Sequence, residues 1–312
     1  SPMAGHSMGA ETAPPASIAP GASHDDEAKA VVDRFLAGEW QQIPGYGNQP
    51  LEPTIDGDTK VFNMTIDPIV HYITATMDPV DALGFNGTWP GPALHITQGD
   101  KMRAVFLNNM DESTGIHFHG QEMPNPMDGV PFVTQPPILP GESFSYEFTV
   151  TPSGSHMYHS HHNATDQVGR GLLGAFIAEP KDKSTLPKYD VEYTMIINDG
   201  LLGFTLNGKN FPATAPVVAK KGQTVLVRYL NEGISIHPMH LHGMAQQVIA
   251  IDGYPLANPY YTDTVACAPG NRYDVLIKAE EPGLWAFHCH VLPHVEGSDG
   301  MFGMVTVLII QE

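Results

Sequence analysis

The chain contains the same sequence unit twice. Gly99 precedes His117 by 18 residues, and Gly222 precedes His240 by the same 18. The offset between the copies is 123 up to this histidine and 129 after it, so a single loop differs by six residues. Any fold of this chain must therefore contain two similar units. The matching segments are ITQGDKMRAVFLNN (96–109), HFHG (117–120), LPGESFSYEFTV (139–150) and PSGSHMYHSH (152–161), then AKKGQTVLVRYLNE (219–232), HLHG (240–243), APGNRYDVLIKA (268–279) and PGLWAFHCH (282–290).

Within each unit the apolar pattern is that of β-strands. KMRAVFLNN and RYDVLIKA alternate polar residues with β-branched and aromatic ones, and Pro-Gly and Asn-Gly steps separate such segments. Several short strands in about 120 residues indicate a β-sandwich, and the 31 glycines and 28 prolines suit a chain with many turns. The sequence therefore predicts an all-β protein with two tandem sandwich domains.

The proposed boundaries follow composition. Residues 1–50 are rich in Ala, Pro, Gly and Ser and are predicted to form a flexible N-terminal tail. The charged segment EPKDKSTLPKYD (179–190) holds two prolines and is the predicted linker. The first domain is then assigned to 51–184 and the second to 185–312.

Charge and the few cysteines exclude several classes of protein. Fifteen Lys and Arg stand against 34 acidic residues, a formal charge of −19 that disfavours nucleic acid and anionic membranes as partners. No run approaches the roughly 18 apolar residues of a membrane span. No secretory hydrophobic region is present either, and the expectation is a secreted or periplasmic protein whose signal peptide has been removed. Only Cys267 and Cys289 occur, which excludes a disulfide framework.

Paired histidines are the main candidate ligands. On a strand, residues i and i+2 point to the same face, so each His-x-His pair projects two imidazoles in one direction. Neutral imidazole suits copper, zinc and iron. Two domains that meet face to face would enclose a metal cluster at their interface. The four pairs are His117/His119, His159/His161, His240/His242 and His288/His290.

A second kind of site is expected in the second unit alone. His237, Cys289 and His294 supply two imidazoles and one thiolate, the trigonal set of a blue-copper electron-transfer centre. Cys289 lies between His288 and His290 and points to the opposite face of the strand. The blue site and the cluster would thus lie on either side of one strand.

The repeat also identifies the weak axial ligand of a blue site and what the first unit lacks. Met301 is favoured over Met304, because Met304 belongs to MVTVLII, a strand that enters the core. In the first unit Thr114, Ser160 and Thr165 take the places of His237, Cys289 and His294. One blue copper per chain is expected.

The motifs HFHG, MYHSH, HPMHLHG and HCHVLPHVEGSDGM resemble, in order, the four copper-binding motifs of the multicopper oxidases. TWPGPALHITQGD (88–100) is similar to the family's first-domain entry sequence, and the resemblance covers about residues 60–310. It implies cupredoxin-like Greek-key sandwiches. The absence of a third sandwich makes the chain most similar to the two-domain, or small, laccases.

The resemblance implies four coppers per chain equivalent and a laccase-type reaction, in which one-electron oxidation of phenolic or aromatic substrates is coupled to reduction of dioxygen to water. Electrons would pass from Cys289 to His288 and His290. Small laccases are ring-shaped homotrimers with the cluster between subunits, which implies the same assembly here. The type 1 ligands would be His237, Cys289, His294 and Met301; the type 2 ligands His117 and His240; and the type 3 ligands His119, His159, His161, His242, His288 and His290.

Two residues near the first motif complete the comparison. Asp128 matches an acidic position of the family's first domain and is the candidate proton donor; the alternative is that Asp128-Gly129 simply forms a turn. Some small laccases have a tyrosine four residues after the second histidine of the first motif, but this chain has Met123 there. A redox role of that tyrosine therefore does not transfer.

Three other functions stay open at this point. A cuprous or ferrous metal oxidase shares the oxygen chemistry and differs only at the substrate surface. A copper nitrite reductase has its type 1 cysteine in the first domain, where this chain has Ser160. A copper-binding or electron-carrier protein without turnover would need only the blue site.

Overall fold

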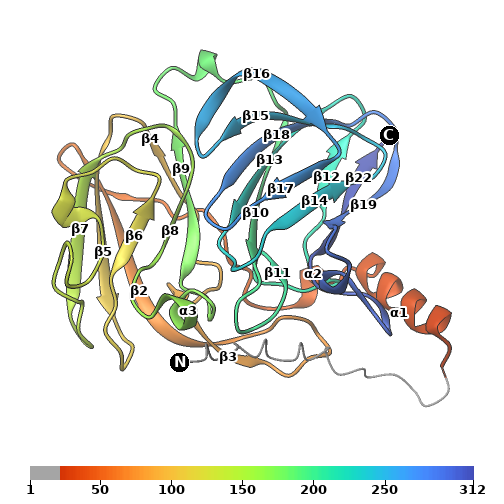
Figure 1. Cartoon of the computed structure of the whole chain (residues 1–312), viewed down its shortest axis with the longest axis horizontal. Helices are drawn as coiled ribbons and strands as arrows, with labels where there is room; N and C mark the ends of the chain where they lie inside the picture. The colour runs from red at the N-terminus through yellow and green to blue at the C-terminus, as the bar shows by residue number, and fades with distance from the viewer. Residues whose placement is uncertain (1–21) are drawn as a thin grey trace, which may run out of the picture.

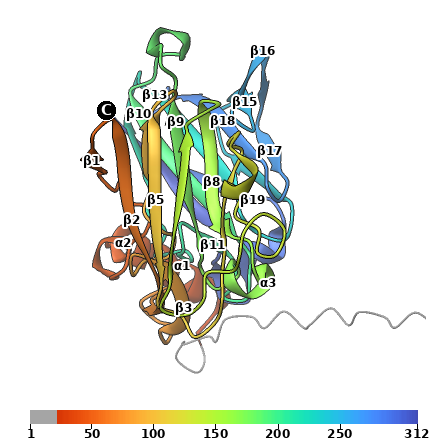
Figure 2. The same cartoon turned by 90° about the vertical axis from the view of Figure 1, so that its left-hand side faces the viewer.

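The computed structural model describes residues 22–312, and it consists mainly of β-strands in two sandwiches (Figure 1). The first sandwich pairs two sheets. One contains β1 (Thr54–Asp56), β2 (Thr59–His71), β5 (Lys101–Asn108) and β7 (Ser143–Thr149), with β3 (Val80–Phe85) also on β2. The other contains β4 (Leu94–Thr97), β9 (Leu173–Glu179), β8 (Gly154–Ser160) and β6 (Ile116–His119). Figure 2 shows the long paired strands of this sandwich, β2 with β5 and β8 with β9, from the side.

The second sandwich has a six-stranded and a five-stranded sheet. The six-stranded sheet follows the order β11 (Thr205–Leu206), β10 (Val191–Asn198), β13 (Thr224–Asn231), β18 (Arg272–Lys278), β15 (Gln246–Ile251) and β16 (Tyr254–Thr262). The five-stranded sheet follows β12 (Val217–Lys220), β22 (Val305–Gln311), β19 (Gly283–Cys289), β14 (His237–Leu241) and β17 (Thr264–Cys267). A short hairpin of β20 (Glu296–Gly297) and β21 (Gly300–Met301) lies outside both sheets.

The sequence repeat is a structural repeat. Strands β5 and β13 occupy matching positions, as do β8 and β19, and both sandwiches combine parallel with antiparallel pairs. In each, the strand that carries the first His-x-His pair lies beside the strand that carries the second pair. The all-β prediction with two cupredoxin-like sandwiches is confirmed.

Alternating burial along the strands builds a core in each sandwich. On β5 the side chains of Met102, Ala104 and Phe106 point inward, while their neighbours lie closer to solvent. Burial of one such large apolar side chain contributes about 2 kcal/mol relative to exposure. A separate core in the second sandwich includes Cys267 and Cys289, and both cysteines are buried free thiols.

The prediction of a flexible tail over residues 1–50 is wrong for residues 22–50, and residues 1–21 lie outside the described part of the chain. Helix α1 (His24–Leu36) starts at a capping box in which the side chains of Ser23 and Asp26 each accept the other's backbone N–H. Its Phe35 is buried and packs on Phe211, with ring centroids 5.1 Å apart. The Ala, Pro and Gly content that suggested disorder is concentrated before residue 22, whereas HDDEAKAVVDRFL holds neither Pro nor Gly.

Other helical segments are short: α2 (Glu39–Gln42), α3 (Ala164–Gln167) and the 3-10 turns Asn125–Met127, Lys183–Thr185 and Leu292–His294. The predicted linker 179–190 joins β9 to β10. Within residues 22–312, no helix is long and apolar enough to cross a membrane.

A buried polar network holds the two sandwiches against each other. Ser155 on β8 donates to Asp274 on β18 at 2.5 Å, and Arg228 on β13 donates to the Ser155 hydroxyl at 3.0 Å. The Arg272 guanidinium donates to the backbone oxygen of Ser155 at 3.0 Å. Because every group is paired, the contact is specific as well as buried.

Candidate metal centres

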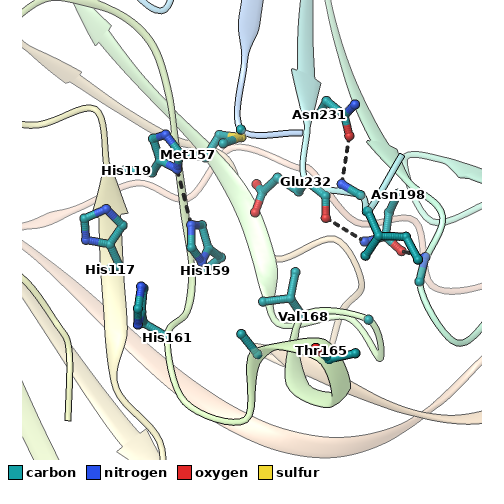
Figure 3. Close-up of a pocket in the computed structure, with 16 residues that line it drawn as sticks. His117, His119, Met157, His159, His161, Thr165, Val168, Asn198, Asn231 and Glu232 are labelled. Atoms are coloured by element: carbon teal, nitrogen blue, oxygen red, sulfur yellow. Dashed lines mark hydrogen bonds between the residues drawn. The ribbon is translucent and has the colours of Figure 1, made fainter. Parts of the chain in front are cut away.

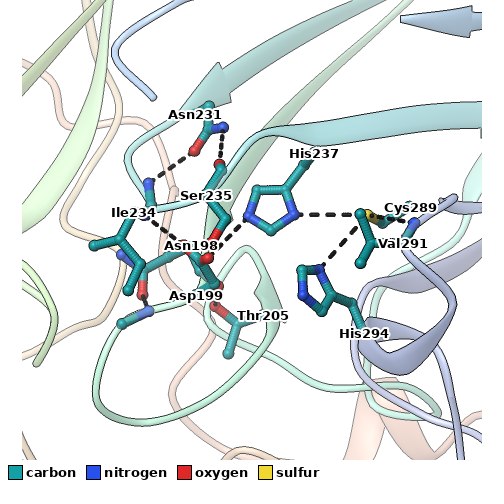
Figure 4. A network of polar contacts seen from close by, with 12 residues as sticks. Asn198, Asp199, Thr205, Asn231, Ile234, Ser235, His237, Cys289, Val291 and His294 are labelled. Atoms are coloured by element: carbon teal, nitrogen blue, oxygen red, sulfur yellow. Dashed lines mark hydrogen bonds and ion pairs between the residues drawn. The ribbon is translucent and has the colours of Figure 1, made fainter. Parts of the chain in front are cut away.

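Three predicted ligands meet in the second sandwich. His237 begins β14, Cys289 ends β19, and His294 ends the turn that follows. The Cys289 sulfur lies 3.6 Å from Nδ1 of His237 and 3.9 Å from Nδ1 of His294 (Figure 4). All three side chains are buried, and their ligand atoms lie within 4.8 Å of one another. A buried set of two imidazoles and one thiol fits a blue-copper centre.

The first sandwich has a hydrogen-bonded cluster where the second has this site. Gln167 on α3 accepts hydrogen bonds from Thr114 at 2.8 Å and from Ser160 at 2.5 Å. Ser160 and Thr114 hold the positions of Cys289 and His237, and neither offers an imidazole or a thiolate. The set of two imidazoles and one thiol therefore occurs only in the second copy of the repeat.

Two neighbours of the trio were not found from the sequence. Asp199 places Oδ2 3.3 Å from Nε2 of His237 and accepts the N–H of Ile234 at 2.5 Å (Figure 4). Burial raises the pKa of the Asp199 carboxyl, but hydrogen bonds from His237 and Ser235 outweigh it and lower the pKa to about 2. A carboxylate on the outer nitrogen fixes the imidazole orientation and leaves Nδ1 for a metal. In sequence, Asp199-Gly200 looks like an ordinary turn.

Phe204 is the other neighbour. Its ring stacks on that of His294, with centroids 4.1 Å apart and 22° between the planes. This contact fixes the orientation of the His294 ring and excludes water from one of its faces. No spacing in the sequence links Phe204 to His294, because the contact depends on the loop between β10 and β11.

The axial position stays a prediction. Met301 lies on β21, half-buried against the core of the second sandwich. Met304 is fully buried, and its backbone accepts the N–H of Cys289 at 3.0 Å and donates to the His294 carbonyl at 3.1 Å. Met304 thus ties the Cys289 and His294 segments together through its main chain.

Copper loading is expected to weaken as pH falls. Burial raises the pKa of the Cys289 thiol to about 11, so below this pH the metal-free site holds a proton that a bound metal must displace. Copper affinity of this site should fall about tenfold for each unit that the pH decreases. Competition with a chelator of known proton affinity at two pH values measures it. A pH-independent affinity would contradict the assignment of Cys289 as a ligand.

The paired histidines form two sets, one on each sandwich. On the first, β6 and β8 place His117 opposite His159, and the ring centroids of His117 lie 5.6 Å from His159 and 5.8 Å from His161. Figure 3 shows the four rings of this set facing one cavity. On the second, β14 and β19 place His240 opposite His288 at 5.7 Å.

Backbone carbonyls select the nitrogen that each set offers. Nδ1 of His159 donates to the Ser160 carbonyl at 2.9 Å, and Nδ1 of His288 donates to the Cys289 carbonyl at 2.8 Å. Nδ1 of His117 donates in the same way to the Asp128 carbonyl at 2.7 Å. A carbonyl only accepts, so Nδ1 carries the proton and Nε2 keeps its lone pair for a metal.

The charge state of the first set also suits metal binding. Burial lowers the pKa of His119 to about 3 and that of His159 to about 4, with smaller contributions from neighbouring cations and imidazoles. These rings are neutral at physiological pH, the form that binds metal. Nδ1 of His119 lies 3.4 Å from Nε2 of His159, which leaves two nitrogen atoms converging on one point.

Within one chain the two sets stay apart. Across residues 22–312, the ring contacts of the paired histidines all join members of the same set. His161 of the first set is exposed, as are His242 and His290 of the second. Each set is therefore an open half-site.

Asp128 lies beside the first half-site. Its Oδ1 is 3.6 Å from Nδ1 of His117, and its backbone carbonyl accepts the same N–H. The chain bends at Asp128, and Gly129 has a φ of +91°, a conformation that favours glycine, so the Asp-Gly step also has a backbone role. The two interpretations of Asp128 are compatible. Met123, at the position of the family tyrosine, packs against the core of the first sandwich.

One residue of the cavity was missed by sequence reasoning. Glu232 of the second sandwich lines the cavity of the first histidine set (Figure 3). It follows the strand segment QTVLVRYLN, where the sequence indicates only the end of a strand. Its position beside the histidines depends on how the sandwiches dock.

Comparison with known proteins supplies a family. Two multicopper oxidase family models match residues 69–183 and 184–309. A solved blue copper oxidase from Nitrosomonas europaea is 32% identical with a TM-score of 0.74, over 80% of this chain and 85% of that one.

Two named relatives match in part. Iron transport multicopper oxidase FET5 of Saccharomyces cerevisiae is 30% identical over 67% of this chain, and Laccase-2 of Botryotinia fuckeliana is 31% identical over 64%. The matched regions span only 38% and 40% of those two longer proteins.

Proposed function

Because this chain belongs to the multicopper oxidase family, we propose that it couples the one-electron oxidation of a phenolic or aromatic reductant to the four-electron reduction of dioxygen. Copper is the cofactor that the family and the His237, Cys289 and His294 site imply. The observation that carries the proposal is the order His288-Cys289-His290 at the end of β19, which places a blue-site ligand between two half-site ligands.

Bound copper would supply one-electron transfer at the blue site and dioxygen reduction at a three-copper cluster. The residues of this chain provide the path between the two. Cys289 is buried on one side of β19, and His288 and His290 lie on the other, closer to solvent. The route from sulfur to imidazole therefore runs through a few covalent bonds of one strand.

The ligand assignment is part of the proposal. His237, Cys289 and His294, with Met301 as the axial ligand, would hold one type 1 copper. His117 and His240 would hold the type 2 copper, and the remaining six paired histidines would hold two type 3 coppers. Support comes from the repeat, which places His117 and His240 at matching positions with Nδ1 bonded to a backbone carbonyl in both.

A homotrimer would close the open half-sites. The first set of one chain would face the second set of the next, and a head-to-tail contact that closes at three forms a ring. Exposed apolar side chains flank both sets: Phe132 (79% exposed) and Val133 (77%) on the loop after Asp128, and Leu292 (55%) two residues after His290. Phe132 and Val133 are adjacent in sequence, and a patch of exposed apolar side chains is characteristic of an interaction surface.

Replacement of Asp128 by asparagine tests its proposed role as a proton donor. We expect about 100-fold lower turnover, because an amide beside His117 cannot supply a proton. Steady-state oxygen uptake across a pH series measures the effect. The matched control is Asp111→Asn at an exposed site of the same sandwich. Full turnover of the Asp128→Asn variant at every pH would contradict proton donation by Asp128 and would leave it only a role in the backbone turn.

The function itself is tested by oxygen uptake of the copper-loaded protein with a simple methoxyphenol. Four substrate radicals per oxygen consumed, with no peroxide, are expected from the balance O2 + 4 e⁻ + 4 H⁺ → 2 H2O. No uptake with any reductant, despite full copper loading, would overturn the proposal in favour of a copper carrier or binder.

Oxidation of cuprous or ferrous ions is the second candidate. It is favoured by the similarity to the iron transport multicopper oxidase of Saccharomyces cerevisiae. The same oxygen cell distinguishes the two candidates. Oxygen uptake with metal ions and none with the phenol would indicate that the reductant is a metal ion and not an aromatic compound. The proposed oxygen chemistry would be unchanged.

A further inference from the structure

Glu232 is a buried acid with no hydrogen bond to its carboxyl group. The residue is 7% exposed, and neither side-chain oxygen has a hydrogen-bond partner within residues 22–312. A buried ionised carboxylate without partners is costly, which makes this arrangement unusual unless the group is neutral or functional.

The backbone around Glu232 holds the side chain in place. Its N–H donates to the Ile197 carbonyl at 2.9 Å, and its carbonyl accepts the Asn198 side chain at 3.0 Å. Asn231, one residue earlier, donates from its side chain to the carbonyls of Ser235 and Cys267. The carboxyl group is therefore directed by a rigid main chain rather than by contacts of its own.

The side chain faces the first histidine set across the junction of the two sandwiches. Glu232 comes from the second sandwich, while His117, His119, His159 and His161 come from the first, and all five line one cavity of about 440 Å³ (Figure 3). The same cavity is thus lined by an acid and by a histidine set that we propose takes part in dioxygen reduction.

The charged and polar groups that face Glu232 do not neutralise it. Burial raises the pKa of Glu232 well above its usual range, and the smaller opposing effects of the Gly174 backbone on β9 and of Arg272 on β18 do not outweigh it. Arg272 already donates to the carbonyls of Ser155, Gly270 and Asp252. Tyr158 on β8 donates its hydroxyl to the Pro92 carbonyl. Burial therefore favours the protonated form of the Glu232 carboxyl group.

We propose that Glu232 is a proton donor for dioxygen reduction, delivering protons through the cavity to the first histidine set. The inference rests on the proposed function. Each dioxygen takes four electrons from four reductant molecules, each of which is oxidised by one electron, and four protons that come from solvent, and the products are two waters. Glu232 gives up one proton at a time to the reduced oxygen atoms and is then reprotonated from solvent.

The position of Glu232 differs from that of Asp128. The Asp128 side chain is 38% exposed and lies beside Nδ1 of His117, while Nε2 is the nitrogen that would bind a metal. Glu232 faces the cavity itself. Asp128 therefore lies closer to solvent, and Glu232 is the acid that lines the cavity.

The first test is the infrared spectrum of the metal-free protein. We expect a carbonyl stretch from a protonated carboxylic acid at neutral pH, and its loss in Glu232→Gln. This measurement does not require copper or turnover. A spectrum with no such difference would overturn the inference.

The second test is the reaction of the copper-loaded Glu232→Gln variant. Anaerobic reduction of its blue colour should match the unaltered protein, whereas reoxidation by dioxygen should be about 100-fold slower, because an amide has no transferable proton. Glu232→Asp should restore part of the rate, and the exposed Glu281→Gln should change nothing. Reoxidation of Glu232→Gln at the unaltered rate at all pH values would overturn the inference.

Failure of the inference and failure of the proposed function are distinguishable. If the unaltered protein consumes oxygen and Glu232→Gln equals it, only the role of Glu232 is lost. If the unaltered protein consumes no oxygen with any reductant, the function is lost, and with it the proton donation that rests on it.

Discussion

Replacement of Cys289 by serine is expected to remove the blue colour and to reduce oxygen uptake with every reductant to background. The Cys289 sulfur lies between two imidazole nitrogens at 3.6 and 3.9 Å, and a soft thiolate is the ligand that distinguishes a blue site. A serine hydroxyl is a harder ligand and is not ionised at neutral pH. The substitution removes electron entry while leaving β19 and its flanking histidines in place.

Copper content and the absorption spectrum measure this effect. The Cys289→Ser protein should lose one copper per chain and keep the copper held by the paired histidines. Cys267→Ser is the matched control, because Cys267 is the other buried cysteine and its sulfur donates to the Asn271 carbonyl instead. Blue absorption retained by Cys289→Ser would contradict the assignment of Cys289 as a type 1 ligand.

Mixing two inactive variants is expected to restore activity, because the proposed cluster is shared between chains. His119→Ala disables the first half-site and His242→Ala the second, so each variant alone should be inactive. In a ring formed at random from equal amounts, about a quarter of the interfaces pair an intact first set with an intact second set. Co-expression should therefore recover roughly one quarter of the unaltered activity.

The control is co-expression of His119→Ala with His159→Ala, which damage the same half-site and should stay inactive together. Sedimentation of the copper-loaded protein should give three chains. No recovery in the mixed sample, or an active copper-loaded monomer, would show that the cluster forms within one chain. Either result would contradict the proposed trimer.

The sequence identified the candidate ligands of the proposed metal sites because their pattern is local. His-x-His spacing on a strand places two rings on one face, and Cys289 between His288 and His290 points the other way, as the burial along β19 shows. The repeat also showed that the first unit lacks counterparts of His237, Cys289 and His294. At two of these positions Thr114 and Ser160 donate hydrogen bonds to Gln167. These inferences need only strand geometry and matched spacing.

The prediction of a flexible tail was wrong for residues 22–50 because composition was averaged over too long a stretch. The capping box of Ser23 and Asp26 and the apolar positions Val31 and Phe35 are themselves local signals of a helix. Whether this segment forms a stable helix depends on burial, because Phe35 packs on Phe211 in the core of the second sandwich. A short helix is rarely stable in water without such a partner.

What the sequence alone determined is therefore the repeat, the all-β fold and the identity of the candidate copper ligands, because alternation and spacing act within single strands. Only the tertiary structure decided which other groups surround them. Asp199 reaches His237, Phe204 stacks on His294, and Glu232 faces the first histidine set from the opposite sandwich. These contacts join segments that are distant in sequence, and they arise from how loops and domains pack, which no periodicity in the chain records.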